Sequence, residues 1–158
     1  MALYLKYGSI DGKVSTTGYD KWIELKSFQW GVGRGISSAM GSTQDREASH
    51  PSVSEITVGK EMDISSSKLL EDALGGEMNT KAEIAVCTTG KNEVKEFLRY
   101  TLTNTGLSGY SVTSGGDRPS ESLSLNFTEV EVKYTGLSPE LSGDPAIVKY
   151  NLGTMKVN

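Results

Sequence analysis

The chain has 158 residues, a mass of 17.0 kDa and a formal net charge of −4, with acidic and basic residues interspersed. No cluster of lysine and arginine is dense enough to follow a phosphate backbone, so we expect no nucleic acid partner. No apolar run approaches the length of a membrane span and no Sec-type signal opens the chain, so we expect no membrane insertion.

The composition favours strands and turns, because the chain has 18 glycines, 4 prolines and many serines and threonines. The length suits one domain over residues 1–158 that buries an ordinary hydrophobic core. Cys87 is the single cysteine, which rules out an internal disulfide. We therefore expect folding in a reducing cytosol and an inert, buried thiol at Cys87.

The apolar alternation changes phase in the middle of three segments that otherwise resemble strands. In residues 22–32 the change predicts a bulge or bend near Lys26 and Ser27, because strand side chains alternate with a period of two. The same change occurs in residues 123–134 and in residues 148–157. Bulged strands let a sheet turn a corner and close on itself, so we predict a mainly β fold, as a small barrel or a tightly folded sandwich.

Further strands are predicted at residues 3–7, 52–63, 81–87 and 94–112, the last broken near Gly106. They are interrupted by one short helix, about residues 66–74, which is long enough to cover a side or an end of the barrel. Ser66 or Ser67 is its expected N-cap, Gly75 the residue after its last turn, and Leu69, Leu70, Ala73 and Leu74 its apolar stripe.

The glycine-rich segment FQWGVGRGIS, residues 28–37, has the glycines of a phosphate-binding loop but no helix after them. Since the helix N-terminus supplies the N–H groups that hold an anion, a phosphate site is not supported. Gly31, Gly33 and Gly35 would instead leave one face of a strand bare, where another backbone or chain can approach closely. The polar connection that follows, residues 37–52, has a length that is usually functional or disordered.

Few side chains suit catalysis. His50, the only histidine, lies in the polar connection and is expected to be solvated. Asp117, Arg118 and Glu121 could form an acid/base pair with an oxyanion-stabilising arginine. The alternative is a glycine-rich turn whose arginine satisfies neighbouring carboxylates or carbonyls. We prefer the structural turn, since nothing else in the sequence builds a cleft, and we expect no catalytic residue, cofactor or metal.

Four segments, in their order and spacing, carry a resemblance to a known family: FQWGVGRGIS, VSEITVGKEMD, SSSKLLEDALGG and SGYSVTSGGDRPSESLSLNFTEVEVKYTG. They resemble the haemolysin-coregulated protein (Hcp) family of bacterial type VI secretion, and the likeness covers nearly the whole chain. The most specific part is SLNF followed by the alternating VEVKY. The resemblance implies a small closed β-barrel of two antiparallel sheets with bulged strands and one short helix.

The resemblance also implies a structural and carrier protein without catalysis. Its expected partners are further copies of itself, as homohexameric rings that stack into a tube like a phage tail tube, together with a trimeric spike protein, a contractile sheath and its baseplate. Small effector proteins are expected to be carried and chaperoned in the lumen. The chain is expected in the bacterial cytoplasm before firing and outside or in a target cell afterwards, as the tube component alone.

Individual residues take roles in this interpretation. Gln29 lies opposite the core phase of its neighbours and matches the family position associated with effector contact, so Gln29 and Ser27 are candidates for the lumen. The polar connection matches the family's extended loop that reaches the next ring. The candidate ring-stacking residues are Ser42, Thr43, Gln44, Asp45, Arg46 and Glu47, the candidate subunit contacts are Gly31, Gly33 and Gly35, and Asp117 with Arg118 is the candidate structural turn.

Two other functions compete with the tube. One is a monomeric β-sandwich that binds carbohydrate or peptide, in which Trp22, Trp30 and nearby tyrosines line a ligand face. The other is a hydrolase that uses Asp117 and Glu121. The mass of the protein in solution separates the first of these from the tube.

Overall fold

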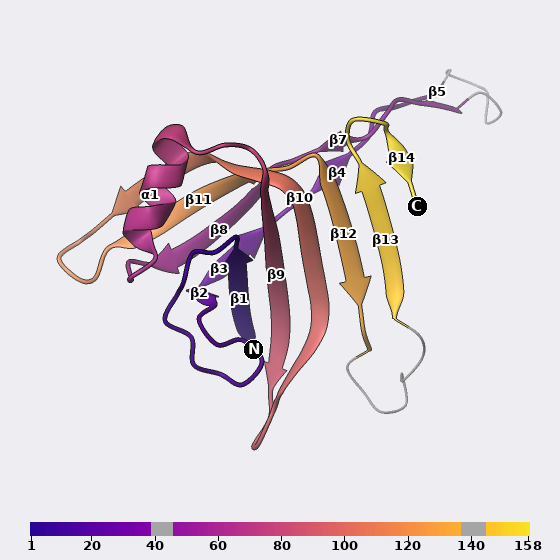
Figure 1. Ribbon diagram of the computed structural model, residues 1–158. Coiled ribbons are helices and arrows are strands. Elements are labelled where there is room, and N and C mark those ends of the chain that lie inside the picture. Colours follow the sequence, from indigo (N-terminus) through magenta and orange to yellow (C-terminus); the bar gives the residue numbers. More distant parts are fainter. Residues whose placement is uncertain (39–45, 137–144) are drawn as a thin grey trace.

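The computed structural model describes residues 1–38, 46–136 and 145–158. Within these residues it is mainly β with one short helix, as predicted (Figure 1). The elements are β1 (Ala2–Tyr7), β2 (Ile23–Leu25), β3 (Ser27–Gln29), β4 (Val32–Gly33), β5 (Ile36–Ser38), β6 (Arg46–Ala48), β7 (Ser52–Val53), β8 (Ile56–Glu61), α1 (Ser66–Gly75), β9 (Thr80–Thr89), β10 (Val94–Thr113), β11 (Ser120–Asn126), β12 (Glu129–Tyr134), β13 (Ala146–Asn151) and β14 (Lys156–Val157).

Two antiparallel sheets share strands and close on each other. Sheet A has the order β2-β1-β9-β10-β12-β13-β14, and sheet B has the order β10-β11-β8-β3. The sheets meet at β10 on one side. On the other side β2 runs into β3 through Lys26, whose N–H donates to the carbonyl of Gly59 on β8 (2.7 Å). The pairing from β1 through β9, β10, β11 and β8 back to β2 and β3 is therefore a closed circuit, the arrangement expected of a small barrel.

β10 is one continuous strand that belongs to both sheets. The predicted break near Gly106 is therefore wrong. Its first part pairs with β9 and β12, and its last part pairs with β11. The register shifts between Leu102 and Thr105 and again between Leu107 and Gly109, and Asn104, inside the first shift, has a positive φ of 51°. These irregularities bend the strand from one sheet into the other without ending it.

The three predicted phase changes have three different outcomes. The change in residues 22–32 is the predicted break, at Lys26 between β2 and β3. The change in residues 123–134 is not a bend within one strand, because β11 ends in sheet B and β12 begins in sheet A. The change in residues 148–157 is a hairpin, in which Tyr150 of β13 pairs with Val157 of β14.

The core lies between the two sheets and is formed by their inward-facing side chains. Leu5, Ile23, Ile84 and Leu102 of sheet A are fully buried against the inner residues of sheet B. Phe28 and Trp30 are half-buried at its border, where their rings lie 4.8 and 5.7 Å from that of Tyr100. The inner residues of sheet B are Ile56, Val58, Leu107, Leu123 and Leu125.

Helix α1 begins at Ser66, as predicted, and ends one residue later than predicted, at Gly75. Its N-cap residue is Ser65 and not Ser66 or Ser67. Leu69 is fully buried, whereas Leu70 and Leu74 of the predicted stripe are exposed. The stripe prediction is wrong for these two leucines, because a helix of this length crossing one side of a barrel covers only a narrow face. No helix among the described residues is long and apolar enough to span a membrane.

The described part of the predicted polar connection forms, with the strands before it, a two-stranded arm. Its base is the pair β4 and β7, and further out β5 pairs with β6. Between the two pairs Ser49 donates its N–H to the carbonyl of Gly35 (2.9 Å). Figure 1 shows this arm extending away from the barrel beside β13 and β14. Residues 39–45 lie outside the described residues.

Candidate functional site

The outer face of sheet B is a surface of small uncharged side chains, which we call the neutral face. Gln29 of β3 pairs with Thr57 of β8, and Thr57 pairs with Ser124 of β11. Ser27 and Gln29 are both exposed on it, because the alternation that turns Phe28 toward the core turns its neighbours outward. The neutral face consists of Ser27, Gln29, Thr57, Gly59, Gly109, Ser111, Ser122 and Ser124.

A glycine is required in the middle of the neutral face. A Cβ atom at Gly59 would lie 2.4 Å from the Oγ atom of Ser27. Only a residue without a side chain leaves room for that hydroxyl. Among the described residues, charged side chains lie at the borders of this face, near the two ends of β8. Glu55 accepts hydrogen bonds from Ser108 (2.7 Å) and Asn126 (3.3 Å), and Glu61 forms an ion pair with Arg118 (3.6 Å).

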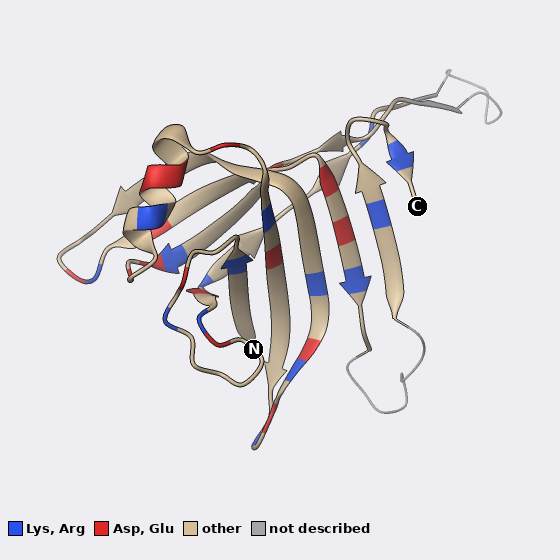
Figure 2. Ribbon diagram, in the orientation of Figure 1, with Lys and Arg blue, Asp and Glu red and all other residues tan. Residues whose placement is uncertain are grey.

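The outer face of sheet A is charged, in contrast to the neutral face. Figure 2 shows its acidic and basic residues on β9, β10, β12 and β13. They form ion pairs across the strands, including Arg99 of β10 with Glu83 of β9 (3.5 Å) and Lys149 of β13 with Glu129 of β12 (2.8 Å). Part of this face is covered by the segment between β1 and β2, where Tyr19 stacks on Tyr4 (5.0 Å between ring centroids). The barrel thus has two outer faces of different chemistry.

The structure does not bring the two tryptophans to one ligand face. Trp22 packs against Tyr19 in the cluster outside sheet A, with the guanidinium of Arg99 5.5 Å from its ring centroid. Trp30 packs against the main core and donates its Nε1–H to the carbonyl of Ser54 (3.1 Å). Nothing in this placement favours the carbohydrate- or peptide-binding sandwich.

The three glycines proposed as subunit contacts lie at the base of the arm, not along one strand with Trp30. Gly33 belongs to β4, and Gly31 and Gly35 flank that short strand. A Cβ atom at Gly31 or Gly33 would meet nothing within 4 Å, so this backbone is open to an approaching chain. The ring-stacking candidates Ser42, Thr43, Gln44 and Asp45 lie outside the described residues, and Arg46 and Glu47 belong to β6.

Asp117 and Glu121 do not form a catalytic pair. Asp117 is exposed in the turn between β10 and β11, where its carbonyl accepts a hydrogen bond from Ser114 (3.0 Å). Arg118, in the same turn, pairs with Glu61. Glu121 is only 2% exposed and points into the barrel, so the two carboxylates lie in different environments.

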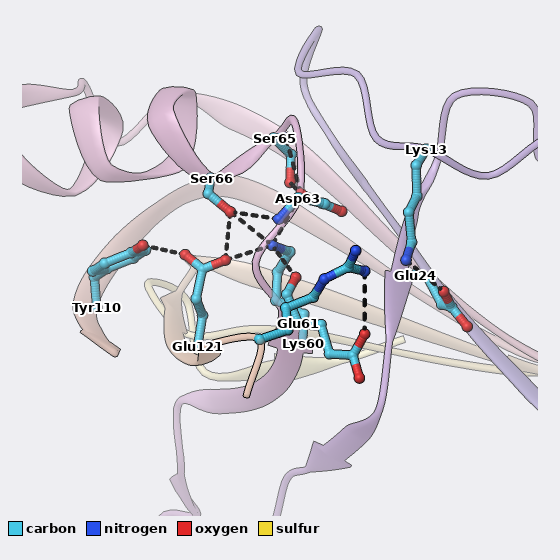
Figure 3. A network of polar contacts seen from close by, with 10 residues as sticks. Lys13, Glu24, Lys60, Glu61, Asp63, Ser65, Ser66, Tyr110 and Glu121 are labelled. Atoms are coloured by element: carbon cyan, nitrogen blue, oxygen red, sulfur yellow. Dashed lines mark hydrogen bonds and ion pairs between the residues drawn. The ribbon is translucent and has the colours of Figure 1, made fainter. Parts of the chain in front are cut away.

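Glu121 belongs to a buried polar network that sequence reasoning missed (Figure 3). Its Oε1 atom accepts hydrogen bonds from Lys60 Nζ (2.7 Å) and Ser66 Oγ (2.5 Å), and its Oε2 atom accepts one from the hydroxyl of Tyr110. Lys60 also pairs with Asp63 (3.1 Å). The network ties the N-terminus of α1 to β8, β10 and β11.

The sequence carried a signal for this network. Lys60 shares the inward phase of β8 with Ile56 and Val58, and Glu121 shares the inward phase of β11 with Leu123. Lys60 lies in the predicted strand 52–63, and Glu121 lies two residues before the predicted strand 123–134, in phase with its apolar side chains. Two opposite charges in such core positions indicate a buried pair, because an unpaired buried charge is very costly.

The network controls the ionisation of its members. Burial disfavours the charged form of Glu121, but hydrogen bonds from Lys60, Ser66 and Tyr110 outweigh burial and hold its pKa below the usual value. Burial, and then the bond to Glu121, raise the pKa of Tyr110 to about 12. These shifts describe a satisfied structural pair and not a proton-transfer group poised near neutral pH.

The remaining reactive side chains are isolated. Cys87 is fully buried in β9, and burial raises the pKa of its thiol, which agrees with the predicted inert thiol. His50 is exposed beside the arm. The described residues contain no group of three or more histidine, cysteine or acidic side chains that could hold a metal ion.

The comparisons with known proteins agree on the class of protein that this fold defines. The family model described as "Type VI secretion system effector, Hcp" matches residues 4–134. A solved structure described as a type six secretion system protein is 29% identical, with a TM-score of 0.88 and 99% of each chain covered. Hcp1 from Salmonella typhimurium is 21% identical with a TM-score of 0.76, covering 99% of this chain and 98% of the other. Among curated proteins, none matches this chain.

A more distant likeness extends beyond type VI secretion. The tube-terminating cap of the anti-feeding prophage has a TM-score of 0.56 and 10% identity, covering 84% of this chain and 88% of the cap. The fold is therefore shared by type VI secretion proteins and this prophage cap protein. The chain belongs to the Hcp family of type VI secretion systems. This family consists of secreted structural proteins that assemble into tubes and are not enzymes.

The buried network leads to a prediction about stability. Replacing Glu121 by Gln should lower the free energy of unfolding by about 3 kcal/mol at neutral pH, because it leaves the Lys60 ammonium poorly compensated in the core. As a matched control, Glu61→Gln removes a half-exposed partner of Arg118 and should cost less than about 0.5 kcal/mol. Urea unfolding of the three proteins measures both values, and equal stabilities would contradict the assignment.

The same carboxylate gives the pH dependence a sign. Because the pKa of Glu121 is lowered on folding, its contribution is complete at pH values above its unfolded pKa, near 4.5, and is lost as the pH falls through the lower folded pKa. Acidification should therefore reduce the difference in the free energy of unfolding between the wild-type protein and the Glu121→Gln variant. A difference that stays constant down to about pH 3 would contradict the lowered pKa.

Proposed function

We propose that this chain is the tube subunit of a type VI secretion system and acts as a single domain. Six copies form a ring with the neutral face toward the lumen, and rings stack into the inner tube. The observation that carries the proposal is the two-faced barrel, neutral on sheet B and charged on sheet A, within a fold shared with Hcp proteins. A tube wall needs two such faces, one for cargo and one for the surrounding sheath.

The neutral face suits a lumen through which different cargo proteins must move. Serine, threonine and glutamine side chains can donate and accept hydrogen bonds without attracting one sign of charge. A strongly charged wall would hold oppositely charged cargo and repel the rest. Gln29 and Ser27 are exposed on this face, which supports their proposed contact with small effectors.

The arm suits a contact between stacked rings. It projects from the barrel, and its described part carries an exposed apolar side chain at Ile36, beyond the base of the arm. Exposed apolar residues on a projecting hairpin are typical of a segment that docks on another surface. In the assembled machine the tube would be capped by the trimeric spike and surrounded by the contractile sheath on its baseplate, and it would leave the cytoplasm when the sheath contracts.

The ring itself is the first test. Light scattering after size exclusion of the untagged protein should give a mass of about six times 17.0 kDa at micromolar concentration, in keeping with the closed cyclic symmetry usual for homo-oligomers. A monodisperse monomer would overturn the proposal and favour the binding sandwich.

The orientation of the faces can be tested with introduced thiols. Gln29→Cys on the neutral face and Thr103→Cys on the outer face of sheet A are both exposed, so a small biotin-maleimide should label both. Streptavidin should then bind rings labelled through the Thr103 variant and fail to bind rings labelled through the Gln29 variant, because it is too bulky to enter the lumen. The buried Cys87 should stay unlabelled in both proteins. Equal binding by the two rings would contradict the assigned lumen.

The stacking role of the arm can be separated from folding. Replacing residues 36–48 by Asn-Gly joins the paired residues Gly35 and Ser49 through a two-residue turn and leaves β4, β7 and the barrel unchanged. Single rings should form with a melting temperature close to that of the wild-type protein, but tubes should be absent in electron micrographs. Tubes of normal length from the shortened protein would show that the arm is dispensable.

A further inference from the structure

One exposed apolar surface of the subunit lies on α1. Leu70 and Leu74 are four residues apart and therefore share a side of the helix, and Leu74 is 80% exposed. Neither packs into the core, which Leu69 enters from another side of α1. Large aliphatic side chains held at this exposure on a rigid helix are suited to contact another surface.

A second apolar surface is a groove at the base of the arm, with a volume of about 340 Å³. Val32 and Val53 from the arm form one wall, and Val148 and Val157 from β13 and β14 form the other. Trp30 lies in the same groove. The wall from the β13–β14 hairpin is open to solvent, since Val157 is 69% exposed.

The two surfaces lie on opposite sides of the subunit. Figure 1 shows α1 at one side of the barrel and the β13–β14 hairpin with the arm at the other. A closed ring of identical subunits is built from contacts in which one patch meets a different patch of the next subunit. One chain must therefore carry two unlike surfaces that face away from each other. The exposed helix and the groove have this arrangement.

The charges around the two surfaces are complementary. The side of α1 that carries the leucines has Glu71, whose exposed carboxylate forms an ion pair with the exposed Lys68 (3.6 Å), and the exposed Glu77 follows the helix. The helix and the residues that follow it thus keep a net negative charge, because Asp72 and Glu77 add two further carboxylates. Arg34 lines the groove and Lys156 precedes Val157 on β14. Neither of these two cations forms an ion pair with another side chain that the structure describes. An acidic helix would thus meet a basic groove, which favours correct docking over the reverse pairing.

We propose that Leu70 and Leu74 of each subunit dock into the apolar groove of the next subunit, with Glu71 facing Arg34, and that this contact closes the ring. The inference rests on the proposed ring and names the surfaces that form it. It also gives a role to the open backbone at Gly31 and Gly33, which borders the groove and leaves room for the incoming helix.

Cysteine cross-linking of the full chain tests the contact. Leu74→Cys combined with Val148→Cys should give, on mild oxidation, a ladder of covalent oligomers up to the hexamer. An equal mixture of the two single variants should stop at covalent dimers, and each single variant alone should give none. Leu74→Cys with Thr103→Cys is the matched control, since both positions are exposed but are not proposed to meet. All variants change exposed residues, so their melting temperatures should match that of the wild-type protein.

Charge reversal provides a second readout. Glu71→Arg and Arg34→Glu should each weaken ring formation several-fold in a dilution series followed by light scattering, and the double variant should recover most of the loss. Rings of normal mass with no cross-link and no response to charge reversal would overturn the docking and leave the proposed function intact. A wild-type protein that stays monomeric would overturn the proposed function, and this contact with it.

Discussion

The structure depends on a single strand that belongs to two sheets. β10 forms hydrogen bonds with β9 and β12 along its first part and with β11 along its last part. The direction of its backbone N–H and C=O groups must therefore turn between the first part and the last part. The positive φ at Asn104 and the two register shifts make that turn within one strand. On the opposite side the turn is made at Lys26, between β2 and β3. With both turns in place the circuit closes and the core is enclosed.

The closed circuit also decides where the protein can meet other molecules. Among the described residues, the last part of β10 pairs only with β11 and β3 pairs only with β8, so sheet B keeps two edges without a strand partner. New contacts can use these edges, a face, the helix, the arm or the β12–β14 extension beyond the circuit. The buried pair of Lys60 and Glu121 fixes α1 to sheet B at the end of the barrel. The helix is thereby presented as a rigid outer element and not as a loosely attached one.

The class of fold could be predicted well from the sequence. The positions where the chain bends or changes sheet could be predicted only in part. Alternation identifies a phase change, but a bulge, a change of sheet and a hairpin all produce one, as Lys26, Phe127 and the turn at Gly153 illustrate. The arm was predicted as a loop because its residues are polar on both sides and lack the alternation of a half-buried strand. The exposure of Leu70 and Leu74 could not be predicted, since an apolar stripe looks the same whether it faces its own core or another chain. Gln29 and Ser27 were placed on the outer face correctly, because their neighbour Phe28 fixed the phase.

The lone buried thiol has a consequence for a protein that leaves the cell. In an oxidising medium outside a cell, exposed cysteines pair or are oxidised. Cys87 has no second cysteine to pair with in its own subunit and is shielded by Tyr4, Tyr19 and Ala85. The covalent structure of the subunit therefore does not depend on the redox state of its surroundings. The folded subunit reaches its final form without an oxidation step.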